Sequence, residues 1–109
     1  MALKKVFSKD NKTCKVTFTV GKDECKDTEF IYLAGDFNQW SSTATPLKKQ
    51  KDGSFTTTVE LPVDQEIQFR YLYDGKYWEN DWEADSYVPS YIGFVDNSVV
   101  ITKKLPKKQ

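Results

Sequence analysis

Large aromatic side chains gather in an acidic part of this sequence, where a hydrophobic core is not expected. Residues 69–94 hold nine of the 16 aromatic residues of the chain. Five of the nine lie in or beside the acidic segment 74–85, namely Tyr77, Trp78, Trp82, Tyr87 and Tyr91. These rings either fold under the loop as a satellite core or form a flat platform on which a ligand stacks.

Trp40 raises the same question, because it follows an apolar run at residues 30–35 and precedes a polar loop. A loop tryptophan either covers the core or presents its ring to a ligand. Sugars suit exposed rings, since the C–H face of a pyranose stacks on an aromatic face at about 1 kcal/mol per contact. Two or three such contacts give a weak affinity that is useful against a polymer with repeated sites.

Carboxylates are the other candidates for chemistry. Asp81, Glu83 and Asp85 lie near the aromatic residues, and glycosidases use two carboxylates. Adjacent acids on a surface turn are usually solvated, and a domain of this size offers little cleft in which to raise the pKa of an acid. We therefore predict that the chain is not an enzyme and needs no cofactor or metal. Calcium binding by the same acids is the alternative, although the EF-hand spacing is absent.

The composition excludes several classes of function. The 109 residues include no histidine, which removes Ser-His-Asp and Cys-His catalysis and His-ligated metals. The formal charge is zero, and Arg70 is the one arginine beside 15 lysines. Nucleic acid needs a basic face, and the apolar runs are far shorter than a membrane helix. We therefore expect neither nucleic acid nor membrane as a partner.

The cysteines and the first residues predict a cytoplasmic protein. The start of the chain lacks the apolar segment of a signal peptide, and structural disulfides are rare in reducing compartments. Cys14 lies in the apolar phase of an alternating run, so we expect it in the core. Cys25 lies in the charged stretch 22–27, so we expect an exposed thiol. A bridge between Cys14 and Cys25 is the alternative for an exported protein.

The elements that must position these residues are strands. Polar and apolar residues alternate at residues 12–20, 54–61 and 65–73, and short β-rich runs occupy 30–35 and 98–102, with a further edge strand at 4–8. Asp-Gly pairs at 52–53 and 74–75 predict tight turns. We predict one all-β domain over residues 1–109, with its core at about 12–102. Its fold is an immunoglobulin-like sandwich of about seven antiparallel strands.

Five segments occur in an order that resembles the family-48 carbohydrate-binding module, the early-set domain of isoamylases and glycogen-branching enzymes. They are Tyr-Leu-Ala-Gly-Asp-Phe-Asn-Gln-Trp at 32–40, Thr-Pro-Leu at 45–47, Asp-Gly-Ser-Phe at 52–55, Gln-Phe-Arg-Tyr-Leu-Tyr-Asp-Gly-Lys at 68–76 and Gly-Phe-Val-Asp-Asn-Ser-Val-Val at 93–100. The chain is also similar to the glycogen-binding domain of the AMP-activated protein kinase beta subunit. Stand-alone bacterial early-set proteins resemble it most.

The resemblance implies roles for particular residues. Trp40 matches the first stacking tryptophan, and Arg70 stands where the kinase-type domain has a sugar-binding lysine. Either Tyr77 or Trp78 matches the second stacking tryptophan. Ile92 matches a leucine that projects through the sugar ring. The sequence departs from the pattern at two positions, where Phe94 replaces a threonine and Asp96 an asparagine.

The resemblance therefore implies non-catalytic binding of an α-glucan of the glycogen or starch type, or of a maltooligosaccharide. The implied carbohydrate-binding residues are Trp40, Arg70, Tyr77, Trp78, Ile92 and Asp96. A glycogen-metabolising enzyme is an expected partner. The alternative is a protein-interaction domain that has kept the fold and lost the sugar, which the changes at Phe94 and Asp96 favour.

Overall fold

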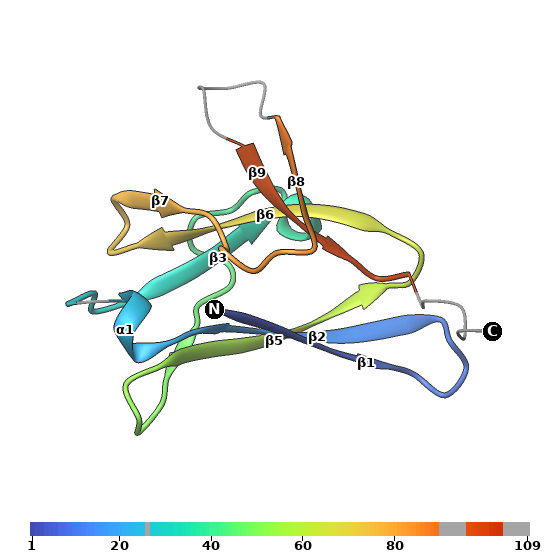
Figure 1. Cartoon of the computed structure of the whole chain (residues 1–109), viewed down its shortest axis with the longest axis horizontal. Coiled ribbons are helices and arrows are strands. Elements are labelled where there is room, and N and C mark those ends of the chain that lie inside the picture. Colours follow the sequence, from blue (N-terminus) through green and yellow to red (C-terminus); the bar gives the residue numbers. More distant parts are fainter. Residues whose placement is uncertain (26, 90–95, 104–109) are drawn as a thin grey trace.

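Two antiparallel sheets stack face to face to form a sandwich (Figure 1). The computed structural model describes residues 1–25, 27–89 and 96–103. Nine strands occur among these residues, and the predicted all-β sandwich is confirmed. The sequence predicts about seven strands, and the structure adds short ones, since β4 and β7 are only two and three residues long. No helix in the described part of the chain has the length and apolar character needed to cross a membrane.

The first sheet has the strand order β1-β2-β5-β4. Its strands are β1 (Ala2–Phe7), β2 (Thr13–Val20), β4 (Lys48–Lys49) and β5 (Phe55–Pro62). The second sheet has the order β3-β6-β9-β8, with β7 also paired to β6. Its strands are β3 (Ile31–Gly35), β6 (Glu66–Tyr73), β7 (Tyr77–Glu79), β8 (Ser86–Pro89) and β9 (Asp96–Ile101). A helical turn α1 (Lys22–Cys25) and a 3-10 turn η1 (Asp36–Asn38) follow β2 and β3.

The core lies between the sheets and follows the period of two that the sequence predicted. Every second residue of β2 is fully buried, from Cys14 to Val20. The matching residues of β6, from Ile67 to Tyr73, are also buried. The Phe18 and Phe69 rings meet edge to face with their centroids 5.1 Å apart. These apolar strand faces are buried against each other, and they hold the two sheets together.

A charged residue interrupts the inward-facing side of the edge strand β1. Leu3, Lys5 and Phe7 share one side of this strand, because each pairs with a fully buried residue of β2. Leu3 and Phe7 pack against the core. The Lys5 ammonium instead reaches the Asp85 carboxylate at 2.6 Å, before β8 begins. This ion pair joins the edges of the two sheets.

The expectation for Cys25 was wrong, whereas that for Cys14 is confirmed. Cys25 is 3% exposed, because α1 turns its side chain inward. Its thiol lies 3.3 Å from the Lys22 carbonyl and 3.6 Å from the Gly53 carbonyl. Both cysteines are free and buried. A single helical turn is too short to leave a helical period in the sequence, so the charged neighbours of Cys25 suggested exposure.

Both Asp-Gly turns form as predicted. Gly53 and Gly75 have φ values of 89° and 68°, in the left-handed region that glycine adopts at little cost. The second turn joins β6 to β7. Asp74 also has a positive φ, and its carboxylate accepts the backbone N–H groups of Glu29 and Phe30. The turn of the β6–β7 hairpin is therefore tied to the chain entering β3.

Candidate functional site

Strand β6 has two faces with different roles. Phe69 and Tyr71 point inward and are fully buried. Gln68, Arg70 and Leu72 alternate with them and face away from the other sheet. Their partners in β3 are known from the register, with Ala34 beside Arg70 and Tyr32 beside Leu72. This outward face of the second sheet is called the outer face below.

Arg70 lies at the point where β6 changes partners. On one edge, β6 pairs with β9 from Glu66 to Phe69 and with β7 from Tyr71 to Tyr73. The Arg70 guanidinium donates to the Asp96 carbonyl at 3.2 Å, and the Asn80 amide donates to the same oxygen at 2.7 Å. Asn80 also accepts the backbone N–H and the hydroxyl of Ser98. A polar cluster therefore closes the gap between β7 and β9.

Trp78 lies on the outer face with Arg70. It pairs directly with Leu72, which pairs on its other side with Tyr32. Residues paired across antiparallel strands share one face of the sheet, so the row runs Tyr32, Leu72, Trp78. Leu72 is 4% exposed although it faces outward, whereas the Trp78 side chain is 45% exposed. Arg70 is therefore next to an aromatic residue that solvent reaches.

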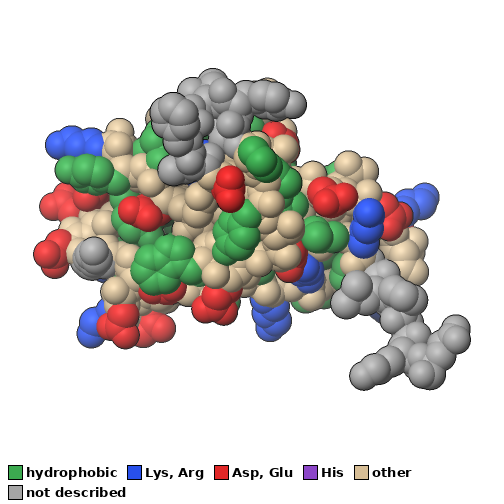
Figure 2. Space-filling view, turned by 45° about the horizontal axis from the view of Figure 1, so that its top comes forward, with side chains coloured by type: hydrophobic (Ala, Val, Ile, Leu, Met, Phe, Trp, Pro, Cys, Tyr) green, Lys and Arg blue, Asp and Glu red, His purple; other side chains and the backbone are tan. Residues whose placement is uncertain are grey.

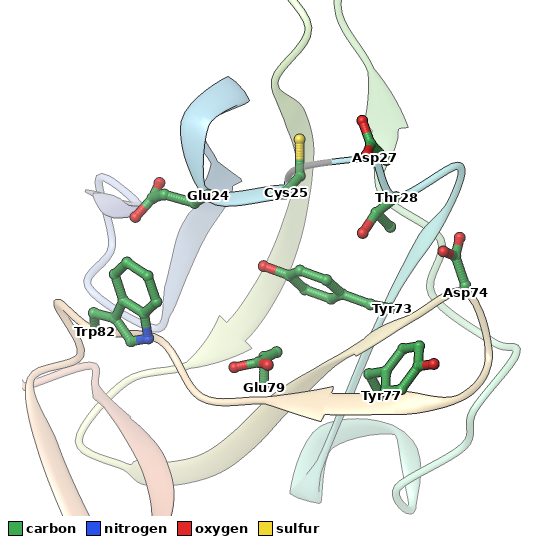
Figure 3. A pocket seen from close by; sticks show the side chains of 9 residues that line it. All are labelled: Glu24, Cys25, Asp27, Thr28, Tyr73, Asp74, Tyr77, Glu79 and Trp82. Carbon is green, nitrogen blue, oxygen red and sulfur yellow. The ribbon is translucent and has the colours of Figure 1, made fainter.

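Tyr77 lies on the opposite face of the same strand. It pairs with Tyr73, which belongs to the buried core. Tyr77 is 63% exposed, and it lines a cavity together with Tyr73 and Trp82 (Figure 3). The sequence left Tyr77 and Trp78 as alternatives for one position. The alternation of β7 brings only Trp78 onto the face that carries Arg70.

Trp40 is held at the end of β3 by hydrogen bonds. Its indole N–H donates to the Asp36 carboxylate at 2.9 Å, and its backbone N–H donates to the Gly35 carbonyl at 2.9 Å. The other Asp36 oxygen accepts the backbone N–H of Gln68 at 3.0 Å. The carboxylate therefore holds the half-buried indole beside Gln68 of β6. Gln68 lies two residues before Arg70 on this strand.

The loop that presents Trp40 has an uncommon backbone. Gln39 and Trp40 are consecutive residues with φ values of 56° and 57°, which non-glycine residues rarely adopt and which cluster at functional sites. The Asn38 side chain stabilises the loop, since it accepts the Gly35 N–H and donates to the Leu33 carbonyl and the Thr45 hydroxyl. Phe37 packs against the core. The Asn38 hydrogen bonds and the Phe37 packing therefore hold the backbone around Trp40 in this conformation.

One further predicted residue, Asp96, lies at the end of this face. Asp96 begins β9, opposite Pro89 of β8, and its carbonyl is the oxygen that Arg70 and Asn80 share. Ile92 and Phe94 lie outside the described residues. Trp40, Arg70, Trp78 and Asp96 are therefore the predicted site residues that lie on or beside the second sheet's outer face.

The three carboxylates considered for catalysis or calcium binding have separate structural roles. Asp81 is fully buried, and its carboxylate accepts the Tyr71 hydroxyl and the Glu83 N–H, both at 2.8 Å. Asp85 pairs with Lys5, and the Glu83 side chain is 69% exposed. In the described part of the chain, no three acidic or thiol side chains are grouped as metal ligands.

Burial shifts the pKa values of both Asp81 and its hydrogen-bond partner Tyr71. It raises the pKa of the Asp81 carboxyl, and the hydrogen bonds from Glu83 and Tyr71 only partly oppose this effect. Burial and the neighbouring Asp81 charge together raise the pKa of Tyr71 well above its ordinary value. Tyr71 thus remains a neutral donor to Asp81. The Tyr87 hydroxyl also donates to the Asp81 carbonyl, at 2.6 Å, so this cluster anchors the loop between β7 and β8.

The sequence of residues 22–107 matches the family model of the glycogen recognition site of AMP-activated protein kinase. The match includes the loop that carries Trp40, the β6–β7 hairpin and β9. No curated protein matches the chain.

Proposed function

Because the chain belongs to the family of the glycogen recognition site of AMP-activated protein kinase, we propose that it binds α-glucans of the glycogen type. Binding is non-catalytic and uses the second sheet's outer face. The observation that carries the proposal is the shared face of Arg70 and Trp78, with Trp40 fixed beside it through Asp36 and Gln68. Tyr77, on the opposite face, takes no part.

The chemistry of this face suits a glucose polymer. The exposed Trp78 ring stacks on the C–H face of one glucose ring, and the Trp40 ring stacks on another. Arg70 and Asn80 carry N–H groups at the gap between β7 and β9, where they reach sugar hydroxyls. Each contact is weak, so a chain with repeated glucose units is bound better than a short oligosaccharide. We also propose a protein partner, which is a glycogen-metabolising enzyme that binds the same polymer.

The test compares neighbouring residues on opposite faces. Wild type, Trp78→Ala and Tyr77→Ala are run on native gels that contain increasing glycogen. We expect glycogen to retard the wild type and Tyr77→Ala equally. Trp78→Ala and Trp40→Ala should each weaken binding about fivefold, the equivalent of one lost stacking contact. Circular dichroism of each variant checks that it is folded.

Two results would contradict the proposal. Equal retardation of the wild type and Trp78→Ala would remove Trp78 from the site. A wild type whose mobility does not depend on glycogen, and whose NMR spectrum is unchanged by maltoheptaose, would favour a protein-interaction domain instead.

A further inference from the structure

A second site lies on the inner side of the β6–β7 hairpin, away from Trp78. A cavity of about 360 Å³ opens between this hairpin and α1 (Figure 3). Three aromatic rings line it, those of Tyr73, Tyr77 and Trp82. Tyr77 and Trp82 are exposed by 63% and 65%. Nothing in the glucan proposal uses these residues.

The Tyr73 hydroxyl is the unexplained group of this cavity. Tyr73 is only 8% exposed, and its buried hydroxyl has no hydrogen-bond partner among residues 1–25, 27–89 and 96–103. Figure 3 shows this hydroxyl directed from β6 toward the side of the cavity where Glu24, Glu79 and Trp82 lie. A buried hydroxyl without a partner is costly and uncommon. A ligand that donates a hydrogen bond would satisfy it.

The charge of the cavity defines that ligand. Four carboxylates line it, among them Glu24 and Glu79, and no described lining residue is Lys or Arg. Hydrophobic and acidic side chains also lie next to one another on the molecular face in Figure 2. Glu24 already binds an ammonium group, since it pairs with the N-terminus of Met1. Aromatic faces and carboxylates together favour a cation.

The protonation of Tyr73 fits a donating ligand. Burial raises the pKa of its hydroxyl, and the Glu79 carboxylate is the next largest cause. The phenol therefore stays neutral and keeps its oxygen as an acceptor. A quaternary ammonium has no N–H to offer this oxygen, and a neutral alcohol can hydrogen-bond but has no charge to pair with the carboxylates. A primary ammonium meets both requirements.

We propose that this cavity binds a primary alkylammonium group. The N–H donors bind the Tyr73 oxygen and the Glu79 carboxylate, while the Trp82 and Tyr77 rings pack against the alkyl chain and the charge. The group belongs either to a lysine side chain of a polypeptide or to a free polyamine. The site is independent of the glucan site, because the two occupy opposite faces of one hairpin.

The test is an NMR titration of the whole chain with n-pentylammonium chloride at constant ionic strength. We expect saturable shifts of the Glu79 and Trp82 amide signals. Tetramethylammonium chloride and 1-pentanol should bind at least tenfold more weakly, because each lacks either the N–H donors or the charge. Equal binding of 1-pentanol or tetramethylammonium would overturn the proposal. Tighter binding of blocked lysine than of spermidine assigns the group to a polypeptide, and the reverse order assigns it to a polyamine.

Three variants make the test specific to the site. Tyr73→Phe removes only the hydroxyl, and Glu79→Gln removes an exposed charge, so Glu79→Gln still tests the site if Tyr73→Phe is unstable. Each should weaken pentylammonium binding about fivefold or more. Glu83→Gln removes a carboxylate outside the cavity and should leave the affinity unchanged. Wild-type affinity in both Tyr73→Phe and Glu79→Gln would overturn the proposal. Neither variant should alter retardation by glycogen, so failure of one proposal is distinguishable from failure of the other.

Discussion

Asp36 connects the Trp40 indole to the backbone of Gln68. One carboxylate oxygen accepts the indole N–H at 2.9 Å, and the other accepts the Gln68 N–H at 3.0 Å. A single side chain therefore sets the position of a loop ring relative to the strand that carries Arg70. In this arrangement the orientation of Trp40 depends on a residue that need not touch the proposed ligand.

We predict that Asp36→Ala weakens glycogen binding severalfold while the chain stays folded. The substitution frees the Trp40 ring and leaves the solvent-exposed Gln68 N–H without its acceptor, at a cost of about 0.5–1.5 kcal/mol in unfolding free energy. Affinity electrophoresis measures the binding, and urea unfolding measures the stability. Asp23→Ala, an exposed acid on α1, is the control. Unchanged glycogen affinity in Asp36→Ala would show that Trp40 needs no such positioning.

Arg70 should tolerate lysine better than methionine. Arg70→Lys keeps a cation with N–H donors at the junction of β7 and β9, whereas Arg70→Met keeps only the apolar stem. We expect Arg70→Met to reduce glycogen affinity about tenfold, the scale of a lost hydrogen bond from a charged group. Arg70→Lys should lose much less. Equal affinities of the two variants would show that the charge and donors at this position do not bind glucan.

Gly35→Ala should destabilise the fold through a steric clash. Its Cβ would lie 2.5 Å from the Gln68 carbonyl oxygen and 3.0 Å from the Phe69 Cβ, and these atoms belong to a paired strand that cannot move away. We expect a loss of about 1–3 kcal/mol in unfolding free energy. Gly75→Asn is the control, because its φ of 68° suits asparagine and there is space around it. A near-neutral Gly35→Ala would contradict the close approach of β3 to β6.

The buried Asp81 should make stability depend on pH. Its pKa is raised above the ordinary 3.8, so the folded chain holds this proton more tightly than the unfolded chain does. The contribution of Asp81 to the unfolding free energy is therefore full below pH 3.8 and is lost as the pH rises through the raised pKa. Urea unfolding of the wild type and Asp81→Asn across this range gives the difference between them.

We expect that difference, wild type minus Asp81→Asn, to fall as the pH increases. Glu83→Gln removes an exposed carboxylate two residues away and is the control. A constant difference for Asp81→Asn would mean that the Asp81 carboxyl has the same pKa in the folded and unfolded chains.

The period of two in the sequence predicted β2, β5 and β6, and short β-rich runs predicted β3 and β9. In β2 and β6 each apolar residue of one phase is buried, from Cys14 to Val20 and from Ile67 to Tyr73, because a sandwich buries one face of each strand. The short strands β4, β7 and β8 were not predicted individually. Two to four residues carry too little periodicity, and their pairing depends on long-range contacts with β5, β6 and β9.

The candidate site was predictable in its residues but not in its geometry. Trp40, Arg70 and Trp78 follow from aromatic residues in polar segments and from the family resemblance. Whether Tyr77 or Trp78 joins Arg70 depends on the register of β7, which the Asp74–Gly75 turn alone does not specify. The inward turn of Cys25 arises from packing between distant segments, and so does the position of the Tyr73 hydroxyl, which has no partner in the part of the chain that the structure describes. No local pattern in the sequence indicates either feature.

The ion pair between Lys5 and Asp85 also bears on self-association. Among the described strands β1 lies at the edge of its sheet, and an edge strand can add a strand from another molecule and so begin aggregation. A strand from another molecule that paired with β1 would continue the apolar layer between the two sheets. That layer is interrupted at β1 by the inward-facing Lys5. Lys5 therefore limits growth of the sheet at this edge. The proposed binding to a glucose polymer would bring many copies of the domain together, and at that high local concentration a protected edge strand opposes aggregation.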